Sequence, residues 1–345
     1  MKILALLFLL ITLNSCNNER KNSELIIFAR IEYIFNLKSM IANQIWSDFD
    51  NEIYDLPLIY YTNCNSYITN PPKEFLNEFK PKLVFKNQKI KIYKTRKRFD
   101  NVPFHMETSS SIFDARTKVD IPYPVMTCSS FEETTKTIPD TKSTENWVTM
   151  IIHEYFHGFQ FKHKSYLDST IKFTNAVSGD SLSEIFQNNN WFQKKIKKEN
   201  DYLLKAIQAT NKSELIKNIN DFFRLRKERR NDVQRRFNLK IDEYEKVLET
   251  MEGTARYIEY KLQKEFATMK PDKKLMNIDT SYNSYQGFKN YKIENDPWLY
   301  KIGKSYFYST GFNMARLLDK LEIKYKTRLF KEGNLSLEQL LLNVN

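Results

Sequence analysis

Residues 151–163 read IIHEYFHGFQFKH. They place two histidines, His153 and His157, four positions apart with Glu154 between them. On an α-helix, residues four apart lie on the same face, so both imidazoles can point to one metal ion. Glu154 then lies beside them, near enough to accept a proton from a water molecule at that ion. The spacing therefore predicts a helix that carries a metal site.

Histidine is rare in this chain, which has four in 345 residues. Three of the four lie between His153 and His163, and such clustering indicates a shared cause. Apolar residues recur at four-residue intervals through the same run, as a helix with one buried face requires. These residues are Trp147, Ile151, Tyr155 and Phe159. The alternative is a helix in which the histidines merely pair with local acids.

The third metal ligand has three candidates, of which His163 and Glu184 are the weaker two. His163 has the spacing of the metzincin pattern HExxHxxGxxH, but Gln160 replaces the glycine at which that chain turns back. If the helix continues, His163 points away from the face of the first two histidines. Glu184 follows His157 at a distance that some thermolysin-like enzymes tolerate, but nothing around it adds support.

Glu252 is the stronger candidate. It lies in VLETMEGTARYIEY, residues 247–260, whose apolar positions recur at helical spacing. Gly253 follows it directly, and a glycine inside a helix costs about 1 kcal/mol relative to alanine. Its presence therefore indicates that another segment packs closely there. The alternative is that Glu252 pairs with Arg256 on a solvent-exposed face.

The HEYFH motif followed by EGTARY resembles the gluzincin group of zinc peptidases, in which a helix carrying Glu-Gly-x-Ala supplies the third ligand. The layout also resembles a set of uncharacterised bacterial proteins with HExxHxxQ, an Arg-rich helical middle and then EGxA. The resemblance covers about residues 145–320, and only the two short motifs are specific. It implies one zinc ion bound by His153, His157 and Glu252. It also implies that Glu154 is the general base.

The distance between the two motifs is longer than in most such enzymes, since Glu252 follows His157 by 95 residues. We therefore expect residues 185–245 to form a helical insertion that returns the second metal helix to the first. The basic run FFRLRKERRNDVQRRF lies within it. The simplest interpretation of this run is a solvent-exposed helical face, although one of its arginines could meet a substrate carboxylate.

The run FYSTGFNMARLLDKL contains Tyr308, followed by Gly311 and Phe312. It is similar to the Tyr-x-x-Gly-Phe segment of leukotriene-hydrolase-type aminopeptidases, whose tyrosine stabilises the developing oxyanion. The similarity implies that role for Tyr308, with Tyr306 as the nearby substitute. The alternative is that Tyr308 is an ordinary core tyrosine.

The order of the elements predicts an α+β fold. Residues 24–50 show helical spacing, and residues 56–131 contain short β-prone runs divided by prolines and polar clusters. Beyond Ser143 the helical spacing continues to the end, apart from a loop around residues 268–298. We expect a small N-terminal sheet (portion 24–142) followed by a mainly helical portion (143–345). The gluzincin resemblance implies that the latter is a zincin-like, thermolysin-like catalytic domain.

Zincins bind substrate along an unpaired sheet edge, and two runs could supply it here: PFHMETSS (103–110) and KVDIPYPVM (118–126). In the first run, Glu107 could hold a free amino terminus, which would make the enzyme an aminopeptidase. His105 is a conceivable fourth metal contact, although an ordinary polar contact is the simpler interpretation.

The chain opens with MKILALLFLLITLNSC, an apolar run too short to span a bilayer and typical of a secretory signal. A cysteine after Leu-x-Ser resembles a bacterial lipobox, which implies cleavage after residue 15, lipid on Cys16 and a tether over residues 16–23. The protein is then expected to be extracytoplasmic and anchored to a bacterial membrane. An ordinary signal is the alternative. Cys64 and Cys128 would remain as thiols able to pair.

The net charge of +12 is dispersed along the chain, and no glycine-rich phosphate motif occurs, so we expect no nucleic-acid partner. Together these features predict a lipid-anchored zinc metallopeptidase with a peptide or protein substrate. The alternative is a non-catalytic zinc-containing binding or scaffold lipoprotein.

Overall fold

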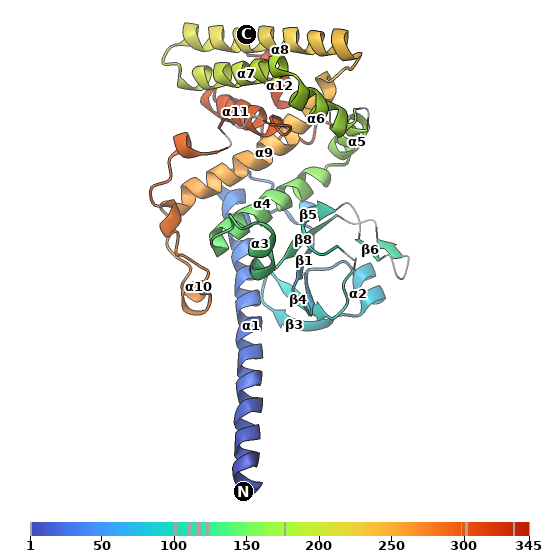
Figure 1. Cartoon of the computed structure of the whole chain (residues 1–345), viewed down its shortest axis with the longest axis vertical. Coiled ribbons are helices and arrows are strands. Elements are labelled where there is room, and N and C mark those ends of the chain that lie inside the picture. Colours follow the sequence, from blue (N-terminus) through green and yellow to red (C-terminus); the bar gives the residue numbers. More distant parts are fainter. Residues whose placement is uncertain are drawn as a thin grey trace. The chain divides into compact units, whose positions relative to one another are not determined.

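The computed structural model combines β-strands, within residues 58–129, with helices that form most of the remaining chain (Figure 1). The α+β class predicted from the sequence is confirmed. For residues 2–22, 112–114, 119–121 and 180 only the backbone is described, so Cys16 lies outside the described side chains. Otherwise the structure describes residues 2–344 except 100–101, 110–111, 115–118, 122–123, 176, 298, 301–302 and 334.

The chain divides into two compact units, each discontinuous in sequence. Helices α4 (Thr144–Phe161) and α9 (Asp242–Phe266) contribute residues to both units. Within the described residues, no helix is long and apolar enough to cross a membrane. The first unit comprises Met1–Met40, Leu56–Ile152 and Lys264–Lys289, and the second comprises Ile41–Asp55, His153–Gln263 and Asn290–Asn345.

The first unit is built on a six-stranded sheet with the order β3-β4-β2-β1-β8-β5. Strand β8 runs parallel to β1 and antiparallel to β5, which lies at the end of this order. Two further strands, β6 and β7, form a separate antiparallel pair. The bounds are β1 Leu58–Tyr61, β2 Ser66–Thr69, β3 Lys82–Lys86, β4 Lys91–Thr95, β5 Met106–Ser109, β6 Ile112–Asp114, β7 Val119–Ile121 and β8 Val125–Ser129.

Helices cover both faces of the sheet. Phe28 of α1 (Lys2–Gln44) contacts the ring of Tyr67 on β2, with centroids 6.2 Å apart. Ile68, the next residue, joins the apolar cluster formed with α2 (Lys73–Phe79). Because successive strand residues point to opposite faces, α1 and α2 lie on opposite sides of β2. This double cover explains why both β1 and β2 are buried throughout.

A buried ion pair fixes the start of α4. Arg30 of α1 donates two hydrogen bonds to Asp279, at 2.8 and 2.9 Å, and the Thr144 hydroxyl donates to the same carboxylate at 2.8 Å. Trp147, one turn further along, donates from its indole to the Ser129 carbonyl of β8 at 3.1 Å. The helix is thereby anchored to the sheet before it reaches the HExxH motif. The remaining helices of this unit are α3 (Phe131–Thr137), α10 (Lys273–Ile278) and the short 3-10 turn Gln286–Phe288.

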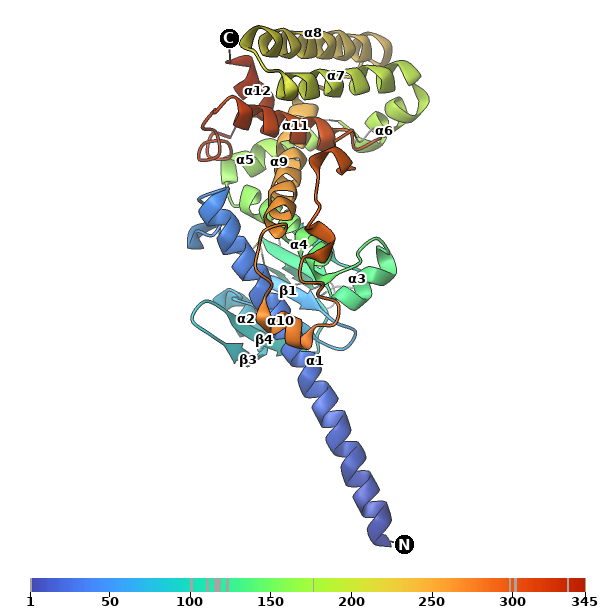
Figure 2. The same ribbon diagram turned by 90° about the vertical axis from the view of Figure 1, so that its left-hand side faces the viewer.

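The second unit is helical. Helices α7 and α8 lie side by side, and α11 packs against α7 (Figures 1 and 2). Most of residues 185–245 are helical. Besides the C-terminal ends of α1 and α4, the helices are α5 (Lys164–Thr174), α6 (Gly179–Asn188), α7 (Asn190–Gln208), α8 (Lys212–Phe237), α9, α11 (Phe307–Lys320) and α12 (Leu337–Leu342), with 3-10 turns at Glu52–Tyr54 and Ile293–Asn295.

Three arginines of α8 are buried, so the prediction that this run is a solvent-exposed face is wrong for them. Arg229 is 0% exposed and donates to Glu199 and Glu245 from both edges of its guanidinium, at 2.6–3.0 Å. Arg230 donates to Glu338 at 2.8 Å, and Arg226 donates to it at 3.0 Å. A run of arginines can be buried when carboxylates meet each guanidinium. On the same helix, Arg224 and Arg235 are exposed, as predicted.

Helices α9 and α11 are in backbone contact at two glycines, Gly253 and Gly311. A Cβ added to Gly253 would lie 2.3 Å from the carbonyl carbon of Gly311. A Cβ added to Gly311 would lie 2.1 Å from the carbonyl oxygen of Glu249. No side chain fits between the two backbones, which confirms the close packing predicted at Gly253.

We expect Gly253→Ala to lower the free energy of unfolding by about 3 kcal/mol. Alanine favours a helix interior over glycine by about 1 kcal/mol, so the loss would come from the forced separation of α9 and α11. Urea unfolding followed by circular dichroism measures it. Gly287→Ala is the control, because a Cβ there meets nothing within 4 Å and stability should hardly change. Equal effects of the two substitutions would contradict the close contact.

The Arg–Glu network of α8 predicts a pH dependence. Burial would raise the pKa of Glu338, but Arg226 and Arg230 outweigh it and lower the pKa to about 2. In the unfolded chain a glutamate titrates near pH 4.3, so the pairing stabilises the fold above about pH 4.3 and is lost as the pH falls toward 2. The contribution is about 3 kcal/mol. Glu338→Gln should therefore be less stable than wild type at pH 7, with the difference narrowing between pH 5 and 2. A difference that stays constant with pH would contradict the pairing.

Candidate metal site

Three side-chain atoms from α4 and α9 converge within the second unit. The Nε2 atoms of His153 and His157 are 3.0 Å apart. The Oε2 atom of Glu252 lies 3.2 Å from His157 Nε2 and 3.5 Å from His153 Nε2. Neighbouring ligands of a tetrahedral zinc ion are about 3.3 Å apart, given bonds of about 2.0–2.1 Å. Two histidines and one glutamate with this spacing fit a zinc ion.

Glu154 belongs to the same cluster. Ligand atoms of His153, Glu154 and His157 lie within 4.8 Å of one another, so this group could hold a metal ion. Glu154 is only partly buried, whereas both histidines are 6% exposed. The Oε2 atom of Glu252 lies within 3.5 Å of Nε2 of both imidazoles. This arrangement leaves Glu154 beside the cluster as a group able to exchange protons.

The outer nitrogen of His157 contacts Gln160, one turn along α4. His157 Nδ1 lies 2.9 Å from Gln160 Oε1, and Gln160 Nε2 donates to the Met251 carbonyl and to Thr254 Oγ1, each at 2.9 Å. Gln160 is fully buried. From the sequence, Gln160 is a departure from the metzincin pattern and the last residue of HExxHxxQ, but neither pattern predicts its contact with the site.

The outer nitrogen of His153 contacts a carboxylate that sequence reasoning also missed. His153 Nδ1 lies 2.6 Å from Glu259 Oε1. Glu259 follows Glu252 by two helical turns, so the two share a face of α9. Arg256 bonds to Glu259 and, at 2.6 Å, to Asp296. The alternative in which Arg256 lies on a solvent-exposed face is therefore wrong, because Arg256 is 1% exposed and these two carboxylates hold it.

Carboxylates give the site a strong preference for positive charge. Burial alone would lower the pKa of His153, but Glu259, Glu252 and Glu154 raise it to about 10. Burial likewise opposes the charged form of His157, and Glu252 makes the largest contribution to raising its pKa. A buried cluster that draws protons onto its histidines in this way is also one that attracts a cation.

Tyr308 lies at this cluster. Its ring is nearly parallel to that of His153, with centroids 6.2 Å apart. Burial raises the pKa of its hydroxyl, and the charge and hydrogen bond of Glu252 raise it further. The phenol therefore stays protonated at neutral pH and can donate a hydrogen bond. The contact of Gly311 with Gly253 places Tyr308, one turn earlier in the chain, beside Glu252.

Tyr306 lies elsewhere in the second unit. It is fully buried, and its hydroxyl bonds to Glu245 within the Arg–Glu network. Of the two tyrosines considered from the sequence, Tyr308 is thus the one at the candidate metal site.

The other two candidates for the third ligand lie in different surroundings. Helix α4 ends at Phe161, and His163 precedes α5. The His163 ring stacks on Tyr54 with centroids 4.2 Å apart, and its Nδ1 lies 2.8 Å from the Phe159 carbonyl. Glu184 is exposed on α6.

The remaining residues considered from the sequence belong to the first unit. His105 is buried and stacks on Tyr61 with centroids 4.2 Å apart. Glu107 is exposed on β5, the strand at the end of the described six-stranded order. Residues 118 and 122–123 of the second edge-strand candidate lie outside the described residues. Cys64 is exposed, Cys128 is buried, and the two are not joined.

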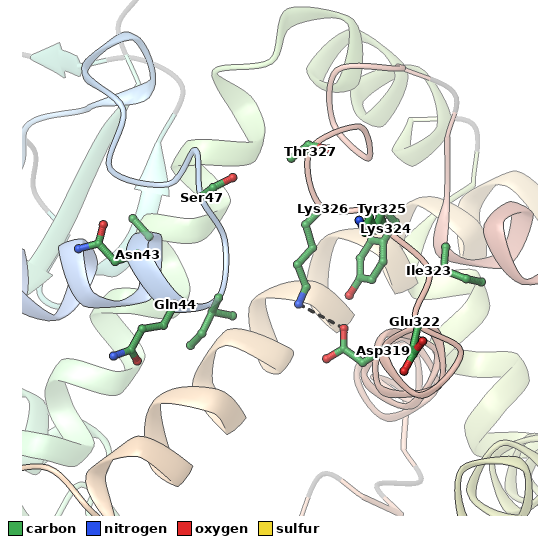
Figure 3. Close-up of a pocket in the computed structure, with 12 residues that line it drawn as sticks. Asn43, Gln44, Ser47, Asp319, Glu322, Ile323, Lys324, Tyr325, Lys326 and Thr327 are labelled. Atoms are coloured by element: carbon green, nitrogen blue, oxygen red, sulfur yellow. Dashed lines mark ion pairs between the residues drawn. The ribbon is translucent and has the colours of Figure 1, made fainter.

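A separate hollow in the second unit has a volume of about 450 Å³ (Figure 3). It is lined by the end of α1 and by residues 319–327, and Asp319 pairs with Lys326 at 3.2 Å. None of the residues at the metal cluster lines it. The hollow is therefore separate from the His–Glu cluster.

Comparison with known proteins adds no relative. Models of protein families, curated proteins and solved structures were searched, and none matches this chain.

Proposed function

We propose that this protein is a zinc-dependent peptidase of gluzincin type. The observation that carries the proposal is the convergence of His153 Nε2, His157 Nε2 and Glu252 Oε2 at separations of 3.0–3.5 Å. Each histidine also has an outer partner on its Nδ1 atom, as metal-binding histidines do. Together the donor set and its outer partners support zinc.

Each residue has a distinct role in the proposed reaction. Zinc, when bound, would supply Lewis acidity toward a water molecule and a peptide carbonyl. Glu154 accepts the proton of the attacking water and returns it to the leaving amine. The Tyr308 hydroxyl donates a hydrogen bond to the developing oxyanion. Lipid attachment at Cys16, and hence an extracytoplasmic location, remains part of the proposal on the basis of the sequence alone.

Metal content tests the ligand assignment. We expect one zinc per chain in wild type and a loss or strong weakening in Glu252→Ala, because two imidazoles alone bind the ion poorly. Elemental analysis of purified protein that begins after Cys16 measures it.

Two controls accompany this experiment. Glu184→Ala makes the same change on an exposed face, and His163→Ala removes a histidine that packs on Tyr54. Both should retain one zinc. If His163→Ala alone loses the metal, or if wild type binds none under metal-replete conditions, the ligand assignment is wrong.

Hydrolysis tests the catalytic assignment. Glu154→Gln should keep its zinc but lose peptide hydrolysis by at least about a thousandfold, because an amide cannot accept the proton. Tyr308→Phe should lose about a hundredfold in kcat, the usual effect of removing one oxyanion donor. A broad peptide library with mass-spectrometric detection supplies the substrate.

The hydrolysis experiment also separates the proposal from its alternative. Unchanged hydrolysis in Glu154→Gln would contradict the mechanism. A wild-type protein that holds zinc and cleaves no peptide would support a binding or scaffold role.

A further inference from the structure

We propose that Gln160 is a positioning residue for the metal. Its single amide fixes which nitrogen of His157 carries the proton, and it also fixes the register of α9, which carries Glu252, against α4. This inference rests on the proposed metal site, which it deepens. Gln160 itself does not touch the ion, because its contacts are to His157 Nδ1, to the Met251 carbonyl and to Thr254.

The orientation of the Gln160 amide follows from its partners on α9. A backbone carbonyl can only accept a hydrogen bond, so the atom 2.9 Å from the Met251 carbonyl oxygen must be the amide nitrogen. Thr254 Oγ1 donates its own hydrogen to the Thr250 carbonyl at 2.7 Å, and it therefore accepts from Gln160. Both amide hydrogens are thus directed to α9, and Oε1 must face His157.

The state of His157 follows in turn. Gln160 Oε1 can only accept, so His157 Nδ1, at 2.9 Å, is the protonated nitrogen. In the neutral imidazole, Nε2 then keeps its lone pair, and Nε2 is the atom directed toward His153 and Glu252. Without Gln160, nothing in this set of contacts would favour that tautomer over the other.

The same side chain ties together the two helices that supply the ligands. Met251 immediately precedes Glu252 on α9, and Thr254 follows it by two positions. Gln160 is three residues from His157 on α4 and is 0% exposed. The two hydrogen bonds that Gln160 donates thereby set the position of Glu252 along the axis of α9 relative to His157 on α4. A displacement of about 1 Å would be enough to spoil the ligand geometry.

The two histidines are held by chemically different partners. His153 faces the Glu259 carboxylate, whereas His157 faces a neutral amide. A carboxylate strengthens the ligand as a donor by its charge. An amide adds no charge at His157, so its effect is to orient the imidazole through the hydrogen bond. Substitution of Gln160 should therefore disturb the geometry of the metal more than the net charge of the site.

The test is the binding of Zn²⁺ and Co²⁺ to the protein from residue 17 to its C-terminus. Gln160→Met keeps the side-chain length but removes all three hydrogen bonds. We expect it to weaken zinc binding by about 10–100-fold and to change the visible absorption spectrum of bound Co²⁺. Gln193→Met is the matched control, since Gln193 donates to the Phe186 carbonyl at 2.7 Å away from the metal cluster. It should leave both readouts unchanged.

Two further variants keep the proposal testable if Gln160→Met fails to fold. Thr254→Val removes one acceptor on α9 but leaves the bond to His157, and it should weaken zinc binding less than any change at Gln160. Gln160→Glu retains an acceptor for His157 but sets a carboxylate oxygen against the Met251 carbonyl, so it should also weaken binding. Unfolding of the metal-free variants in urea separates lost stability from lost metal geometry.

The outcomes distinguish this inference from the function on which it rests. If wild type binds zinc, and the Gln160 variants bind it as tightly with an unchanged Co²⁺ spectrum, the positioning role is wrong while the metal site stands. If wild type binds neither metal, the proposed function is overturned and the positioning role with it. A loss of affinity that merely follows the loss of stability would also overturn the positioning role.

Discussion

The second unit depends on the compensation of negative charge along one helix. Helix α9 carries four carboxylates that are buried or nearly so, and each must meet a positive or hydrogen-donating group to remain there. Glu245 and Glu249 face the arginines of α8, and Glu259 is held by Arg256 and His153. Glu252 faces two histidines, and the proposed zinc ion would bind at this position. The four are Glu245, Glu249, Glu252 and Glu259.

Helix α11 completes this arrangement with hydroxyl groups. Tyr306 bonds to Glu245, Thr310 donates to Glu249 at 2.6 Å, and Tyr308 bonds to Glu252. These contacts require the two helices to approach until their backbones touch, which only the paired glycines permit. The Arg–Glu network and the candidate metal site therefore depend on the same packing of α9 against α11. A change in the network should be felt at the metal through α9.

The sequence was sufficient to predict the parts of the site that depend on local periodicity. The spacing of His153 and His157 on an amphipathic helix requires only the α-helical repeat. Gly253 signalled close packing because glycine is unfavourable in a helix interior, and the structure shows the backbone of α11 against it. The overall α+β class followed from the change near residue 143 from short β-prone runs to apolar residues at helical spacing.

The parts that escaped prediction depend on tertiary contacts between polar residues. Gln160 and Glu259 recur at helical intervals from the proposed ligands, but a polar residue on a helix is usually solvated, and no local rule indicates its burial. The arginines of α8 are a stronger example. Arg226, Arg229 and Arg230 follow the i, i+3, i+4 spacing of a buried stripe, yet their charge suggested exposure. Only the carboxylates of other helices reverse that expectation.

The same limit applies to the third ligand. The local sequence ranks Glu252 above Glu184 and His163. It does not predict that α9 packs against α4, because several helices separate the two in the chain. The contacts that join the two helices, such as those of Gln160 with Met251 and Thr254, are tertiary and leave no local signal in the sequence.

The most direct test of the central claim is anomalous diffraction at the zinc absorption edge, from crystals of the chain grown with zinc. The account predicts one strong peak, about 2.0–2.2 Å from His153 Nε2, His157 Nε2 and a carboxylate oxygen of Glu252. A peak bound by other residues, or no ordered zinc at this cluster, would contradict it.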